Sequence, residues 1–160
     1  MTPEELLQPH ENGGASAQAL ADFEQAFGVV LPQAMKAFYQ IQNGGWFRRD
    51  VDFVVTEDPE EDEDALSLSD FRPIGVHFTT HTHTIDTLLE WQRMDGFLPD
   101  TIVPFCSDEA GDFYYIQADG KGEKIWYIFH EDYDVFLEDP EDCLVAESFT
   151  AFLEMIHIRE

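Results

Sequence analysis

The chain has 160 residues, a length typical of one domain with its own hydrophobic core. Its 34 acidic and 8 basic residues give a formal net charge of −26, which argues against nucleic acid as a partner because Lys and Arg neutralise phosphates. The sequence shows no apolar run long enough to span a membrane and no signal peptide, so we expect a cytoplasmic protein without membrane association.

The composition predicts a packed core and leaves the role of the charge open. A hydrophobic fraction of 44% and 14 phenylalanines are typical of a globular protein, and two cysteines do not make a disulfide framework. Self-repulsion among so many carboxylates opposes a compact state. The negative charge therefore serves either solubility, including life at high salt, or attraction to a basic partner.

Two helices are predicted in the first third of the chain. Residues 1–15, which contain prolines and glycines, are expected to form a loose lead-in. Ser16 is a suitable N-cap for a helix that ends at Gly28, and Pro32 starts a second helix. The second helix is expected to turn one apolar face inward, formed by Ala34, Ala37, Phe38 and Ile41.

The middle of the chain combines a short strand, an acidic loop and a third helix. Residues 51–55 alternate in a way that predicts a half-buried strand. Residues 57–64 hold seven acids and a proline, which predicts a solvated loop. Thr84 is a suitable N-cap for a helix that continues to Met94 and is terminated by Gly96.

Three histidines before the third helix raise the question of a metal site. His81 and His83 are two residues apart and would share one face of a strand, and Asp86 or His77 could add a ligand. The stretch offers no assigned fourth ligand for tetrahedral zinc. We therefore expect no metal and no cofactor, and we interpret these residues as exposed loop histidines.

The most informative stretch is a strand, a turn and a second strand. Residues 102–106 predict a strand, residues 107–112 a tight acidic turn, and Phe113 begins the next strand. Pro104 indicates an edge position or a point where no ladder hydrogen bond is needed. The turn carboxylates have no histidine, lysine or nucleophile beside them in sequence, which favours binding over catalysis.

The last third predicts a hairpin, an acidic segment and a helix. Residues 113–118 and 124–129 are joined by a turn sequence typical of a β-hairpin. Residues 131–142 contain seven acids with Tyr133 and Phe136 interleaved. Such aromatic side chains either anchor a basic protein surface or pack beneath the loop. Ser148 is expected to cap a final helix with an apolar face made of Phe149, Phe152, Leu153 and Ile156.

Several of these motifs occur in a recognisable order. The first half reads Phe-Gly-Val-Val-Leu-Pro at residues 27–32, then Phe38-Tyr39 and Asn-Gly-Gly at residues 43–45. The second half has the strand–turn–strand, residues 126–131, and the helix signature at residues 146–153. This order resembles the SUKH superfamily, the fold of fungal cell-wall-assembly regulators and many bacterial toxin-immunity proteins. One departure is Gln117, where members often carry an aspartate.

We therefore predict an α+β fold in a single domain over residues 16–160, with five or six mostly antiparallel strands flanked by N-terminal and C-terminal helices. The resemblance implies a non-catalytic immunity protein that binds and neutralises a cognate toxin, often a basic nuclease. A regulatory adaptor of the same fold is the alternative, and a metal-dependent hydrolase is a third hypothesis. The expected partner-binding residues combine acids with aromatic anchors: Trp46, Asp108, Asp112, Glu131, Asp132, Tyr133 and Asp134.

Overall fold

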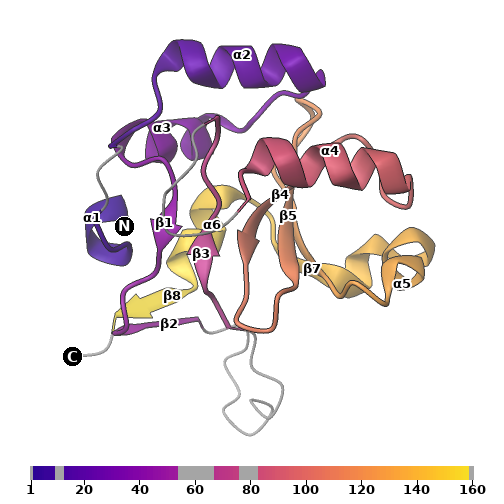
Figure 1. Cartoon of the computed structure of the whole chain (residues 1–160). Coiled ribbons are helices and arrows are strands. Elements are labelled where there is room, and N and C mark those ends of the chain that lie inside the picture. Colours follow the sequence, from indigo (N-terminus) through magenta and orange to yellow (C-terminus); the bar gives the residue numbers. More distant parts are fainter. Residues whose placement is uncertain (1, 10–12, 54–66, 76–82, 159–160) are drawn as a thin grey trace, which may run out of the picture.

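The computed structural model describes residues 2–9, 13–53, 67–75 and 83–158 (Figure 1). Their helical elements are α1 (Pro3–Leu6), α2 (Ala17–Phe27), α3 (Gln33–Ile41), α4 (Ile85–Asp95), α5 (Tyr133–Glu138), the 3-10 helix η2 (Pro140–Cys143) and α6 (Phe149–Glu154). Their strands are β1 (Gly45–Trp46), β2 (Val51–Phe53), β3 (Asp70–Phe71), β4 (Ile102–Ser107), β5 (Phe113–Gln117), β6 (Ile125–Ile128), β7 (Leu144–Ala146) and β8 (Ile156–Ile158).

The strands form one six-stranded antiparallel sheet and a small second sheet. The order in the larger sheet is β1-β3-β4-β5-β6-β7, and β2 pairs with β8. In Figure 1, α4 and α5 lie on the same side of the view, away from α1 and α3. The predicted α+β class, with mostly antiparallel strands between N-terminal and C-terminal helices, is confirmed.

Helix boundaries follow the capping residues that the sequence indicates. The Ser16 hydroxyl accepts a hydrogen bond from the backbone N–H of Ala19 at 3.0 Å, and α2 ends at Gly28, whose φ of 68° lies in the left-handed region. In α4, the Thr84 hydroxyl caps the N-terminus and Gly96, with a φ of 72°, ends the helix. Local side-chain chemistry therefore fixes where these two helices start and stop.

The inward face of α3 differs from the expected one. Met35, Phe38 and Tyr39 are buried, whereas Ala37 is exposed and Ile41 is 54% exposed. Phe38 was predicted correctly and packs edge-on against Phe71 with ring centroids 5.3 Å apart. Ala34 is half-buried against the core, as expected, but Ala37 and Ile41 are not. The larger Met35 and Tyr39 side chains face inward instead and bury more apolar area.

The core has two parts, one on each face of the sheet. The larger part is centred on Phe71, which is fully buried and contacts the rings of Phe105 and Phe149. The smaller part lies beside α5, where Trp126 of β6 packs edge-on against Phe136 at 5.4 Å. Phe136 is thus a core residue, which agrees with the alternative that the aromatic side chains of residues 131–142 pack beneath the loop. This smaller core also supports the site described below.

Two described segments are packed differently from expectation, and a third lies outside the described residues. The described lead-in residues 2–9 are packed rather than loose, because Leu6 and Leu7 are in the core and Leu7 bridges to Phe47. Ile156 lies in β8, not in the last helix, and pairs with Phe53. The acidic loop at residues 57–64 lies outside the described residues, as do residues 54 and 55 of the predicted strand.

Pro104 occupies an interior strand of the larger sheet, so its edge interpretation was wrong. The alternative, that no ladder hydrogen bond is needed at this position, fits the structure. β3 pairs with β4 only at Cys106 and Ser107, and the pairing of β4 with β5 shifts register between Pro104 and Cys106. The proline therefore stands where the β3 ladder does not extend, and it needs no N–H there.

Candidate functional site

A groove opens beside the smaller core, and we call it the α4–α5 groove. It has a volume of about 160 Å³ and receives side chains from α4, the segment after it, the strands β4 to β6, and the start of α5. Its lining consists of Leu88, Trp91, Gln92, Asp95, Phe97, Leu98, Pro104, Gly111, Asp112, Phe113, Tyr115, Ile128, His130 and Tyr133.

Aromatic side chains at the mouth of the groove are unusually exposed. Phe97 is 60% exposed and Trp91 is 46% exposed. The Phe97 ring stacks on Tyr133 with centroids 6.0 Å apart and an interplanar angle of 27°. His83 contacts Trp91 edge-on at 4.5 Å. Grouped exposed rings of this kind mark interaction surfaces more often than single exposed apolar residues do.

The rim of the groove is acidic and carries little compensating charge. Asp95 belongs to the lining, and Asp132 and Asp134 flank Tyr133 at exposed positions. Within the part of the chain that the structure describes, none of these three carboxylates forms an ion pair. The exposed Glu131 carboxylate lies 3.6 Å from Nε2 of His130. The groove therefore joins an aromatic surface to a rim of negative charge.

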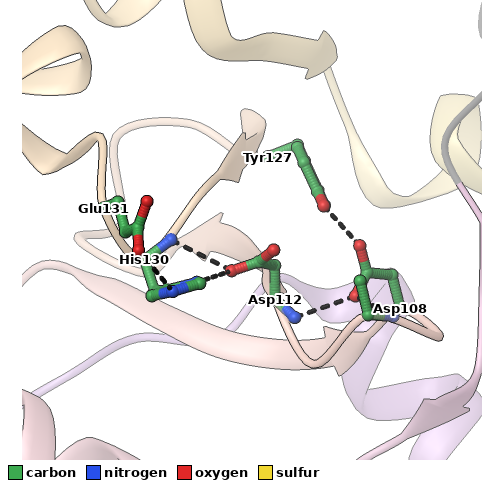
Figure 2. Close-up of polar contacts among 6 residues, drawn as sticks. Asp108, Asp112, Tyr127, His130 and Glu131 are labelled. Atoms are coloured by element: carbon green, nitrogen blue, oxygen red, sulfur yellow. Dashed lines mark hydrogen bonds and ion pairs between the residues drawn. The ribbon is translucent and has the colours of Figure 1, made fainter. Parts of the chain in front are cut away.

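Asp108 is buried beneath this surface and is only 6% exposed. One of its carboxylate oxygens accepts hydrogen bonds from the backbone N–H groups of Ala110 at 3.0 Å and Asp112 at 2.8 Å (Figure 2). The other accepts the Tyr127 hydroxyl. Burial and this hydrogen bond raise the pKa of Tyr127, which keeps the phenol protonated as a donor. Asp108 thus organises the acidic turn and does not lie on an accessible acidic surface.

Asp112 is also buried, at 5% exposed, although part of it reaches the groove lining. Its Oδ1 accepts the backbone N–H of His130 at 3.0 Å and lies 2.7 Å from His130 Nδ1 (Figure 2). This hydrogen bond, and then the negative charge of Asp112, raise the pKa of His130. Asp112 therefore positions an exposed histidine at the groove.

A second buried polar cluster lies beside the acidic turn and has no counterpart in the expectations above. Arg72 Nε is 3.4 Å from a carboxylate oxygen of Asp70, and Arg72 Nη2 donates to the Ser107 hydroxyl at 3.3 Å. Ser107 in turn donates to Asp70. The Arg72 guanidinium also lies 5.5 Å from the centre of the Phe113 ring. In this cluster Ser107 donates to a carboxylate and accepts from a guanidinium, and these contacts stabilise the fold.

The structure brings some of the predicted binding residues together and separates others. Asp112 and Tyr133 line the α4–α5 groove, and the exposed residues Glu131, Asp132 and Asp134 adjoin Tyr133 or the lining residue His130 in sequence. Trp46 does not join them, since β1 and β6 are separated by three strands in the sheet order.

Of the residues that line the groove, only Asp112 and Tyr133 were in the predicted binding set; those missed include Trp91, Asp95, Phe97 and His130. For Trp91 and Phe97, the neighbouring sequence offered an indication. Trp91 lies off the apolar face of its helix, and Phe97 follows the glycine that ends the same helix, so neither had an evident core position.

The histidines do not form a metal site among the residues that the structure describes. Across these residues, no group of three or more His, Cys, Asp or Glu side chains is arranged to hold a metal ion. His83 is described and contacts Trp91, whereas His77 and His81 lie outside the described residues. Likewise, no helix within the described ranges is both long and apolar enough to cross a bilayer.

Comparisons with known proteins show to which family the chain belongs. A search of curated proteins gave no significant match. The sequence model of the SMI1/KNR4 family (SUKH-1) matches residues 14–155, from the start of the α2 region to the end of α6. The match therefore includes every element that forms the groove, and it agrees with the motif order in the sequence. The chain belongs to the SMI1/KNR4 family (SUKH-1).

Proposed function

We propose that this chain is a non-catalytic module that binds a basic protein through the α4–α5 groove, and that it acts as an immunity protein that neutralises a cognate toxin. The observation that carries the proposal is the pairing of exposed aromatic rings with Asp95, Asp132 and Asp134, which form no ion pair with any other described residue. Family membership supports it, since this family is known for domains of the toxin-immunity type and is generally non-catalytic.

The two parts of the groove surface would contribute differently to binding. Phe97 and Tyr133 supply the apolar contact that usually dominates the lifetime of a complex. The carboxylates act at longer range and raise the association rate with a basic partner, by about 10-fold or more at low salt. Physiological ionic strength, with a Debye length of about 8 Å, removes much of that gain.

Affinity capture with matched variants tests the use of this surface. The tagged chain is incubated with lysate of the native cell, beside a Phe97→Ala/Tyr133→Ala variant and an Ile41→Ala control. Ile41 is an exposed apolar residue on α3, outside the groove lining. We expect the wild-type chain and the control to retain one basic protein, identified by mass spectrometry, and the groove variant to lose it. Equal retention by all three chains would rule out the groove.

Growth measurements then distinguish an immunity protein from an adaptor. The captured protein is expressed alone, with the wild-type chain, and with the groove variant. Neutralisation predicts that the captured protein alone arrests growth, that the wild-type chain restores it, and that the groove variant does not. A captured protein that is harmless when expressed alone would contradict the immunity role and favour a regulatory adaptor that uses the same surface.

A further inference from the structure

We infer that the α4–α5 groove recognises an arginine side chain of the basic partner. The inference rests on the proposed function and specifies its chemistry. The groove has a volume of about 160 Å³ and opens to solvent beside exposed rings. This space accommodates one long side chain.

The order of chemical groups in the groove matches an amphipathic cation. Leu88, Leu98 and Ile128 supply apolar lining, whereas Asp95 supplies negative charge. Lysine and arginine bury their methylene stems against apolar surface while the charged end stays near water or a counter-charge. An apolar side chain would fill the groove but leave Asp95 partly desolvated without a partner, which is unfavourable.

The exposed rings favour arginine over lysine. A guanidinium is planar and weakly hydrated, so it stacks on aromatic faces, and it can also donate two parallel hydrogen bonds to one carboxylate. The chain itself uses this contact, since Arg72 lies over Phe113 at 5.5 Å and Arg93 over Phe27 at 5.2 Å. Phe113 lines the groove and already carries one guanidinium, so Trp91 and Phe97 are the rings that a partner's arginine would contact.

Short peptides test the inference with no knowledge of the partner. The probe is acetyl-Gly-Gly-Arg-Gly-Gly-amide, compared with versions in which lysine, citrulline or norleucine replaces arginine. Citrulline keeps the shape of arginine and removes its charge. Binding is followed by the NMR signal of the Trp91 indole N–H, assigned with the Trp91→Phe variant and recorded up to about 10 mM peptide, where single-side-chain contacts are measurable.

We expect a saturable shift with the arginine peptide and about tenfold weaker binding of the citrulline peptide, since the charge interaction with Asp95 is lost. Asp95→Asn should weaken binding of the arginine peptide by a similar factor. Phe97→Leu, which keeps an apolar group but removes the ring, should weaken it about threefold. Glu154→Gln, an equal charge change at the end of α6 and outside the groove lining, should have no effect.

The outcomes separate this inference from the proposed function. Equal binding of the norleucine and arginine peptides, or no saturable shift with any peptide, overturns arginine recognition. The capture experiment with the Phe97→Ala/Tyr133→Ala variant would still stand in that case. Conversely, an arginine-specific shift together with unchanged capture by that variant would support the side-chain site and refute the groove as the partner interface.

Discussion

Replacement of Asp108 by alanine should destabilise the fold by about 3 kcal/mol. The carboxylate satisfies two buried donors, the Asp112 N–H and the Tyr127 hydroxyl, and a third donor at the exposed Ala110. A buried donor left without its partner costs about 1–3 kcal/mol, whereas water replaces the lost contact at Ala110. For a chain of this length, 3 kcal/mol corresponds to a fall in melting temperature of roughly 6–12 °C.

Urea denaturation followed by circular dichroism measures this loss, beside two variants that should lose less stability. Tyr127→Phe removes one of the three hydrogen bonds and should cost about 1 kcal/mol. Glu109→Ala removes an exposed acid from the same turn and should change stability by less than about 0.5 kcal/mol. If Asp108→Ala were as stable as Glu109→Ala, the turn would not depend on the buried carboxylate, and Asp108 would return to the set of candidate surface residues.

Three further outcomes are expected. Phe38→Ala should cost about 3–5 kcal/mol in urea denaturation, because the ring is buried against Phe71 and leaves a cavity; a loss below about 1 kcal/mol would contradict this packing. The folded pKa of His130 lies above its usual value of about 6.5, so its stabilising pair with Asp112 should be complete below that pH and lost as the pH rises through the raised pKa. NMR titration should show the raised pKa of His130 in the wild-type chain and a lower His130 pKa in Asp112→Asn. A His130 pKa that is the same in both chains would exclude Asp112 as the cause. The double charge reversal Glu131→Lys with Asp134→Lys should slow association with the captured partner at low salt and leave the dissociation rate nearly unchanged, as measured by surface plasmon resonance. If the association rate depended neither on salt nor on the charge reversal, the negative charge would serve solubility and not binding.

Features set by neighbours in sequence were predictable in this chain. The N-caps Ser16, Thr84 and Ser148 each accept a backbone N–H three residues ahead, a contact that depends on local geometry alone. The hairpin between β5 and β6 was predictable for the same reason, since its turn residues are contiguous. The acidic and aromatic content near Tyr133 pointed to part of the groove.

Features set by distant residues were not predictable from local patterns. The sequence places Asp108 and Asp112 in an acidic turn that is indistinguishable from an exposed one, and only the approach of Tyr127 and His130 from the β6 region reveals their burial. The pairing of β8 with β2 likewise joins segments about a hundred residues apart. The groove itself combines residues of α4, of three strands and of α5, and these distant segments carry no shared signal in the sequence.

The large negative charge divides into two populations with different physical consequences. Asp70, Asp108 and Asp112 are buried, and each accepts hydrogen bonds or an ion pair from nearby donors, so they stabilise the fold without adding an exposed field. Of the exposed acids at the groove, Asp95, Asp132 and Asp134 form no ion pair among the described residues, whereas Glu131 lies 3.6 Å from Nε2 of His130. Their mutual repulsion opposes compactness in the free chain, and a bound basic partner would relieve it. Binding would then raise the stability of the fold both through mass action and through neutralisation of this surface. Added salt reproduces only the second effect, so the stability gained from the partner should exceed the stability gained from salt alone.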